Sequence, residues 1–334
     1  MKAPFPWFGG KRRVAPLIWK AFGDVDNYVE PFAGSLAVLL ERPAWHKARA
    51  ETVNDADQFL ANFWRALAHD PEAVARWADW PVNEADLFAR HLWLVNTGRE
   101  RLASMDTDPD FYDAQVAGWW VWGICAWIGS GWCSGTGPHT LDTVGKLPHL
   151  GDAGQGVNQP DGPEAFTAGG SGAPPSPWTN PLPDLPVTYG YLAALAERLR
   201  SVRVCCGDWT RVVTRGALNY GATVGVLLDP PYLGDVRTSD LYAADDHHIA
   251  EDVREWAVAH GDDPRLRIAL CGYEPEHVDY MPSTWRMHTY SASKSYGSSA
   301  GGGVNDANRA LERIWFSPHC LSTEGQGSLF EAAS

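Results

Sequence analysis

The chain has 334 residues, enough for two domains or for one large α/β domain with an insertion, and 45% are hydrophobic, which can fill a sizeable core. Lys and Arg number 27 against 41 Asp and Glu, and the resulting net charge of −14 excludes a globally basic protein. A local basic patch can still steer DNA. Lys2, Lys11, Arg12 and Arg13 form such a patch, although a solvated helix start explains Arg12 and Arg13 equally well.

Cysteine spacing and hydropathy narrow the class of protein further. The six cysteines show no C-x-x-C spacing and no neighbouring histidine pattern, so we expect no metal site. Adjacent Cys205 and Cys206 fall in a predicted strand and are expected to be packed thiols in a reducing cytosol. No signal peptide opens the sequence, and the longest apolar run, Ala117 to Gly129, is too short to span a bilayer. We therefore expect a soluble protein in the cytoplasm, with no membrane partner.

The chain opens with Pro6-Trp7-Phe8-Gly9-Gly10-Lys11, and apolar residues at helical spacing follow. The two glycines before a helix let the backbone approach a ligand, and Lys11 near the helix start can reach a carboxylate. An ordinary glycine-rich helix start would give the same pattern.

Two strands that end in acids come next. Tyr28 to Ser35 is typical of a strand, a tight turn and a helix start, and Glu30 stands where such a turn holds the polar groups of a nucleotide-like cofactor. Ala50 to Asp55 is a second predicted strand. Asp55 follows the turn by about 25 residues, close to the spacing of the ribose-binding acid in dinucleotide folds. Asp55 is also a candidate N-cap for a helix from Ala56 to Ala68, and both roles are compatible.

The alternation of strands and helices is lost from about Glu72 to Pro186. Helical patterns cover 72–80, 84–97 and 110–128. A dense group of tryptophans accompanies them: Trp119, Trp120, Trp122, Trp127 and Trp132. We interpret these rings as the core of a small helical unit rather than as a base-stacking platform. Residues 129–137 are expected to form a loop, and the Gly/Pro-rich residues 151–183 a long mobile loop or a disordered segment.

The alternation then resumes. A predicted helix over 188–200 leads into a strand, Val202 to Cys206, that ends at Gly207-Asp208-Trp209. An acid followed by an aromatic ring can bracket an adenine by hydrogen bonding and stacking, but a capped helix start is an equally good interpretation.

The remaining predicted elements are a helix over 246–260 and strands over 223–228, 265–273, 285–290 and 310–318. They complete a sheet of about seven strands. The loop 291–304 carries Lys294 and Tyr296, which could close over a substrate.

The buried strand 223–228 ends in Asp229-Pro230-Pro231-Tyr232. The prolines stop the strand because neither can donate to a ladder, so a carboxylate and a ring are presented at the sheet edge where open α/β sheets bind ligands. The amine of a purine or pyrimidine is a poor nucleophile because its lone pair is delocalised into the ring. Asp229 and the Pro230 carbonyl can accept its two N–H bonds and free the lone pair, while Tyr232 stacks on the base. Alone, the motif could also be only a strand-ending turn.

Taken in order, the motifs at 6–11, 30–35, 55 and 229–232 resemble those of the Dam-type, alpha-class DNA adenine methyltransferases, in particular the phage-like ones. The resemblance implies a doubly wound, mostly parallel, seven-stranded Rossmann-like sheet over 1–68 and 187–320. A helical, loop-rich target-recognition insert would occupy 69–186, and a flexible tail 321–334. The match is only loose in the middle of the chain.

The same resemblance assigns roles to residues. Contacts to S-adenosylmethionine would come from Trp7, Gly10, Lys11, Glu30, Phe32, Gly34, Asp55, Asp208 and Trp209. The flipped base would be held by Asp229, Pro230, Pro231 and Tyr232. Arg237 matches a position that is often basic in related phage enzymes, and together with Arg12, Lys294 and Tyr296 it makes up the expected DNA contacts.

The implied reaction is direct methyl transfer to the N6 amine of an adenine in double-stranded DNA, with the base flipped out of the duplex and no covalent intermediate. Enzymes of this kind serve restriction–modification systems and phages, so we expect a bacterial or phage-infected cell. Two alternatives keep the fold: a cytosine N4 and an RNA adenine methyltransferase. A third, a catalytically degenerate DNA-binding module, is favoured by the acidic charge and by Leu36. This leucine follows Ser35, where the family usually has a second glycine, and its side chain could narrow the cofactor pocket.

The tail carries one further pattern. Gln326-Gly327-Ser328-Leu329-Phe330 resembles the Gln-x-x-Leu-Phe peptide with which bacterial proteins dock onto the replication sliding clamp. Chance is the better explanation for so short a match.

Overall fold

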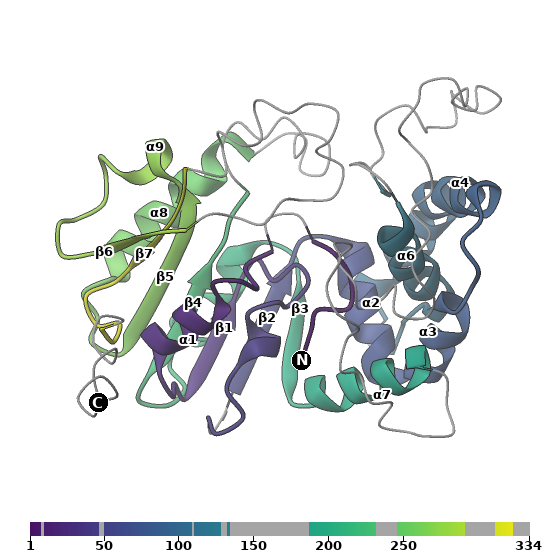
Figure 1. Ribbon diagram of the computed structural model, residues 1–334, viewed down its shortest axis with the longest axis horizontal. Helices are drawn as coiled ribbons and strands as arrows, with labels where there is room; N and C mark the ends of the chain where they lie inside the picture. The colour runs from purple at the N-terminus through teal and green to yellow at the C-terminus, as the bar shows by residue number, and fades with distance from the viewer. Residues whose placement is uncertain are drawn as a thin grey trace, which may run out of the picture.

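Seven strands form one sheet in the order β3-β2-β1-β4-β5-β7-β6 (Figure 1). The computed structural model describes residues 1–7, 10–46, 50–108, 110–127, 132–133, 187–231, 246–290 and 311–322. The strands are β1 Asn27–Glu30, β2 Ala50–Asp55, β3 Val202–Cys206, β4 Val224–Leu228, β5 Leu266–Tyr273, β6 Arg286–Thr289 and β7 Glu312–Phe316.

The sheet is mostly parallel, as the sequence predicted. Strands β3, β2, β1, β4 and β5 pair in parallel, whereas β7 runs antiparallel to both β5 and β6. From β1 the chain moves outward to β2 and β3 and then returns to β4, which lies against the other side of β1. This reversal is a topological switch point, where open α/β sheets bind ligands at the carboxyl ends of their strands. Glu30 ends β1 and Asp229 follows β4, so the fold brings these two acids to that point.

Helices cover both faces of the sheet, as expected for a doubly wound fold. On one face Leu227 of β4 shares a core with α1 (Ala15–Phe22), α2 (Gln58–His69) and α7 (Val187–Leu199). On the other face Val226 of β4 shares a second core with α8 (Asp246–His260). The alternation along β4 is the period of two that a strand buried on both sides requires.

Asp57, and not Asp55, caps α2. The Asp57 carboxylate accepts hydrogen bonds from the backbone N–H groups of Phe59 and Leu60, at 2.8 and 3.2 Å. The alternative that Asp55 caps a helix starting at residue 56 is therefore wrong. The helices of the middle segment begin in the same way, with Asp70, Asn83 and Asp113 at the N-caps of α3 (Pro71–Ala78), α4 (Glu84–Trp93) and α6 (Ala114–Ala126).

Helices α3, α4 and α6 gather beyond the β3 edge of the sheet, with β6 at the opposite edge (Figure 1). The helix expected over 84–97 changes at its end into a π-helical turn, Leu94–Gly98, which is followed by α5 (Arg99–Leu102). The shorter described helices are η1 Leu39–Glu41, η3 Ala103–Asp106, η6 Trp209–Val212 and α9 Glu274–His277.

The tryptophans of the middle segment belong to the core. Trp120, Trp122 and Trp132 are buried, whereas Trp119 and Trp127 are half-buried. Trp120 packs edge-on against Phe5, with 5.0 Å between ring centres, and lies 5.8 Å from Phe63 of α2. The prediction of a core role is confirmed for these buried rings. Their core is, however, continuous with that of the sheet and α2, not a small separate one.

Several predicted features fall beyond the described residues: the loops 151–183 and 291–304, and the loop 129–137 apart from Trp132 and Cys133. Among the described helices, none combines the length and the apolar composition needed to cross a membrane. The cysteines at 125, 133, 205, 206, 271 and 320 are free thiols. The described part of the chain contains no cluster of three or more His, Cys, Asp or Glu suited to a metal ion.

Candidate active site

The Asp229 carboxylate forms an ion pair with Lys11, with Nζ 2.9 Å from Oδ1. Lys11 lies just before α1 and is 4% exposed, whereas Asp229 at the end of β4 is 19% exposed. Burial alone would lower the pKa of Lys11, but the negative charge of Asp229, with a smaller contribution from Glu312 of β7, outweighs it and the pKa is raised. Lys11 therefore stays charged and holds the Asp229 carboxylate in place.

The turn after β4 is rigid. Pro230 is buried and Pro231 is half-buried, and neither has a free backbone N–H. Tyr232, the last residue of this motif, lies outside the described residues.

Glu30, at the end of neighbouring β1, is buried and accepts a hydrogen bond from the Tyr28 hydroxyl at 2.9 Å. Burial raises the pKa of Glu30 to about 8; the bond from Tyr28 opposes this rise, and the charges of Asp229 and Asp55 add to it. A carboxyl that titrates near neutral pH at a ligand-binding edge is typical of a functional site.

A tight turn follows β1, and its shape depends on Gly34. The φ of this glycine is +46°, and a Cβ here would lie 2.4 Å from the Nε1 of Trp7, so the indole packs directly on the backbone. The Gly34 N–H donates to Asp55 Oδ2 at 3.0 Å, and the Asp57 N–H donates to Asp55 Oδ1 at 3.0 Å. Asp55 thus joins the turn after β1 to the start of α2. On the other side, the Gly10 N–H donates to the Trp7 carbonyl at 3.2 Å, which closes the turn before Lys11.

Asn54 was not singled out by the sequence reasoning. Its Nδ2 donates to the carbonyls of Pro31 at 3.0 Å and Gly207 at 2.9 Å, and so ties together the ends of β1, β2 and β3. Its Oδ1 is buried and has no hydrogen-bond partner among the described residues. Its only signal in the sequence was its place as a polar residue next to Asp55 at a strand end, and the search for acids at strand ends did not include amides. The roles of Tyr28 and Glu312 were missed as well, because both stand within predicted strands.

Asp208 and Trp209 lie at the end of β3. The Asp208 side chain is exposed and accepts from the Thr210 N–H at 2.9 Å, which confirms the interpretation as a capped helix start. Trp209 is buried, with its ring centre 6.1 Å from Phe32 and 6.4 Å from Trp256. Phe32 is only half-buried, so its ring is the more accessible of the pair for stacking.

Leu36 adopts the left-handed backbone conformation that favours glycine, with φ +59°. Its side chain is completely buried in the core shared with α1 and α2. Leu36 thus points inward and contributes to packing, which gives no support to the expectation that it narrows the cofactor pocket.

Of the residues expected to contact DNA, only Arg12 lies in the described part of the chain. This side chain is half-exposed and its Nε lies 3.6 Å from Oε1 of Glu41. Arg237, Lys294 and Tyr296 lie outside the described residues, as do Phe8, Gly9 and the tail pattern at 326–330.

Comparison with known proteins adds to this geometry. Residues 7–90 match the family model of the D12 class N6 adenine-specific DNA methyltransferases. The matched segment includes Trp7, Lys11, Glu30, Gly34 and Asp55, which build one half of the site, whereas Asp229 lies outside it. No curated protein matches the chain.

Proposed function

We infer from this match and from the site that the chain is a D12 class N6 adenine-specific DNA methyltransferase, which moves a methyl group from S-adenosylmethionine to the N6 amine of adenine in DNA. The observation that carries the proposed residue roles is the Lys11–Asp229 pair at the switch point of a seven-stranded sheet. The topology of the sheet, the acids at its edge and the family match all support this function.

The residues around β1 and β2 fit the methyl donor of this family. S-adenosylmethionine, when bound, supplies an electrophilic methyl group on a positively charged sulfur. The buried Oδ1 of Asn54 offers an acceptor to a hydroxyl or amine donor, and the Gly34 turn brings backbone close to the site. Glu30 with its pKa of about 8 would ionise more readily beside a cationic ligand. We propose that these residues, with Lys11 and Phe32, hold the donor.

We propose that Asp229 and the Pro230 carbonyl accept the two N–H bonds of the target amine. These bonds draw the nitrogen toward tetrahedral geometry and localise its lone pair for attack on the methyl carbon. The new N–C bond would form as the S–C bond breaks with its electron pair left on the sulfur, and the methylated amine would release one proton to water. Lys11 keeps Asp229 ionised and oriented in this scheme, and the rigid Pro230–Pro231 turn fixes the acceptors without rearrangement.

Helices α3, α4 and α6 are proposed to belong to the target-recognition insert, between catalytic parts at 1–68 and 187–320. They lie between the two halves of the site in the sequence. Helices α3 and α6 pack against α2, α3 also packs against α7, and α4 packs against α6.

The decisive experiment measures transfer of labelled methyl groups to unmethylated DNA, followed by nucleoside analysis, for the wild type and Asp229→Ala. We expect label in N6-methyladenine that disappears with Asp229→Ala, while the variant still binds S-adenosylmethionine. Label in cytosine would overturn the target. Cofactor binding without any transfer would point to the degenerate module instead. Parallel thermal melting separates a lost catalytic group from a lost fold.

Clamp docking through 326–330 remains a prediction from sequence, as do the phage and restriction–modification contexts. Deleting residues 323–334 and repeating a pull-down with purified sliding clamp tests the docking. Equal capture of the intact and the shortened protein would rule it out.

A further inference from the structure

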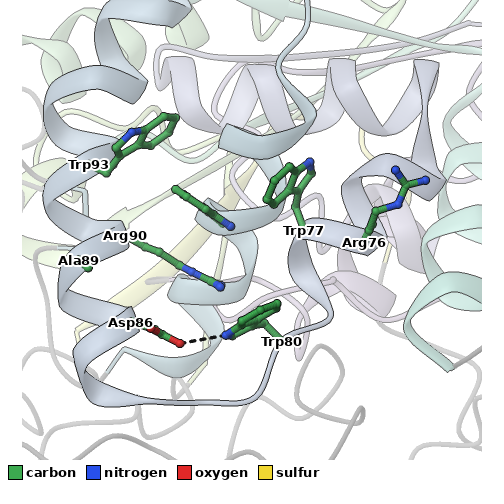
Figure 2. Close-up of a pocket in the computed structure, with 8 residues that line it drawn as sticks. Arg76, Trp77, Trp80, Asp86, Ala89, Arg90 and Trp93 are labelled. Atoms are coloured by element: carbon green, nitrogen blue, oxygen red, sulfur yellow. Dashed lines mark hydrogen bonds between the residues drawn. The ribbon is translucent and has the colours of Figure 1, made fainter.

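A cavity of about 540 Å³ lies among α3, α4 and α6 (Figure 2). Its lining shares no residue with the catalytic site. Its lining includes the indoles of Trp77, Trp80, Trp93 and Trp119 and the guanidinium groups of Arg76 and Arg90. Its volume is within the range of small-molecule sites.

Aromatic rings lie near the guanidinium group of Arg90, and one of its N–H donors has no hydrogen-bond partner among the described residues. Its guanidinium carbon lies 5.0 Å from the ring centre of Trp80, 5.1 Å from that of Trp119 and 4.3 Å from that of Trp122. The side chain is 8% exposed, and its Nη1 is buried without a hydrogen-bond partner among the described residues. Stacked faces leave only the in-plane N–H groups for hydrogen bonding, and a buried donor that is left unbonded is costly.

The carboxylate in the lining does not satisfy this donor. Asp86 Oδ2 instead accepts from the Trp80 indole N–H at 2.9 Å (Figure 2). No ion pair joins Asp86 to Arg90 within the described part of the chain. Asp86 holds the Trp80 ring in place, and Arg90 keeps a donor for an acceptor from outside.

The other indoles offer stacking surfaces. Trp77 and Trp93 both meet Trp119 nearly edge-on, with ring centres 5.7 and 5.0 Å away and interplanar angles of 89° and 75°. Trp77 is 38% exposed and Trp80 is 52% exposed. Large aromatic rings left in contact with water around a hollow are a feature of binding sites.

These walls select a planar ligand with adjacent acceptor atoms on one edge. Among the bases, guanine presents O6 and N7 side by side and is the usual partner of an arginine edge, whereas adenine places an amine donor beside N7. Base faces also stack readily on indoles. Exposed Arg76, on the far side of the cavity in Figure 2, adds positive charge for a phosphate on this acidic protein.

We propose that the cavity binds an unstacked guanine of the DNA substrate, separately from the flipped adenine, with the edge of Arg90 donating to the guanine acceptors. The proposal rests on the proposed function for its choice of DNA as the partner. The protein would then hold a second base while Asp229 engages the first.

The test compares single-stranded thymine dodecamers that carry one central guanine, 7-deazaguanine or adenine, by fluorescence anisotropy with the full chain. The 7-deaza base keeps the ring and O6 but lacks N7. We expect the guanine strand to bind about tenfold tighter than the other two, since a factor of this order is typical of a good arginine–guanine contact. Equal binding of all three strands would mean backbone contacts only and would overturn the guanine site.

A variant that narrows the cavity, compared with a matched control, tests whether guanine binds there. Ala89 is exposed on α4 and lines the cavity, so Ala89→Phe should place a ring in it and narrow it without removing a contact. Ala103 is exposed and lies outside the lining, so Ala103→Phe makes the same change elsewhere. We expect Ala89→Phe to abolish the preference for guanine and Ala103→Phe to retain it, with unchanged melting in both. A preference that survives Ala89→Phe would refute the proposal.

Methyl transfer gives a separate readout. Ala89→Phe should raise the KM for duplex DNA with little change in kcat and none in S-adenosylmethionine affinity. If the wild type transfers no methyl group, the proposed function fails, yet the dodecamer comparison still decides on the guanine site.

Discussion

The ammonium of Lys11 and the carboxylate of Asp229 meet at 2.9 Å, although one residue precedes the first helix and the other follows the fourth strand. The pair joins the motif at 6–11 to the motif that begins at Asp229. Lys11 is almost fully buried, so its charge depends on this partner.

The Lys11–Asp229 pair predicts a separation of stability from activity. Asp229→Asn should lower the free energy of unfolding by about 3 kcal/mol, because it removes the anion that lies 2.9 Å from a buried ammonium. The double variant Lys11→Met/Asp229→Asn should recover most of this loss, yet neither protein should methylate DNA. Urea unfolding followed by circular dichroism and the labelled-methyl assay measure the two quantities. A double variant as unstable as Asp229→Asn alone would show that the pair does not set stability.

Glu30 predicts a pH dependence of stability. Its pKa of about 8 in the folded protein lies above the ordinary value of 4.5, so the folded state binds more protons between these values. The free energy of unfolding should therefore fall as the pH rises from about 4.5 to about 8, by up to about 1.4 kcal/mol per pH unit from this group. Glu30→Gln should remove that slope. Urea unfolding across this range checks it, and identical slopes in both proteins would contradict the assignment.

Replacing Leu36 by the glycine that is usual in the family should improve neither the stability of the protein nor its affinity for S-adenosylmethionine. Leu36→Gly relieves a left-handed conformation worth about 1 kcal/mol but loses buried side-chain packing worth about 2–5 kcal/mol. We expect a less stable protein with unchanged S-adenosylmethionine affinity. Leu36→Ala loses similar packing and keeps the strain, so it should be less stable than Leu36→Gly. Thermal melting and calorimetric titration measure both, and tighter cofactor binding by Leu36→Gly would revive the idea of a narrowed pocket.

Replacing Glu51 should lower the stability of the protein without lowering kcat. Its buried carboxylate accepts two bonds from Arg198, at 2.8 and 3.0 Å, and one from Arg42 at 3.3 Å. Glu51→Gln should cost about 3–5 kcal/mol because it leaves two arginines without their shared anion. Glu51 and Asp55 are about 13 Å apart along β2, from the rise per residue of a strand, so kcat at low temperature should be unchanged. A stable variant with impaired kcat would contradict this.

The fold was predictable because its signals are local. The apolar strands and the helices between them follow from hydrophobic periodicity, whereas the mostly parallel, doubly wound sheet was implied by the resemblance to the Dam-type enzymes. Such a sheet brings the acids at its strand ends to one edge. The partners of these acids were not predictable. Nothing local says that Lys11 would meet Asp229, that Tyr28 would bond to Glu30, or that Asn54 would bridge three strand ends, since each contact depends on side chains brought together by the sheet.

Two residues show the same physical limit of sequence analysis. Asp55 and Asp57 are both good caps by type, and only the backbone path decides that Asp57 takes the N-terminus of α2. Leu36 was judged by what a glycine does for the backbone, whereas its side chain has an independent role in the core. The sequence pattern gives the type of residue, and the three-dimensional surroundings decide which of its properties is used.

Trp7 lies between the turn after β1 and helix α6, because its indole packs on Gly34 and its ring centre lies 6.4 Å from that of Trp120. Helices α3 to α6 therefore share a core with the sheet and are not a separately packed unit. A chimaera that imports only α3 to α6 from a relative would place foreign side chains against Trp7 and so against the turn after β1. Under the proposed role of these helices in target recognition, changes of target sequence should arise by substitutions at their rim, where the shared core is not disturbed. A successful graft would have to carry the first seven residues with it.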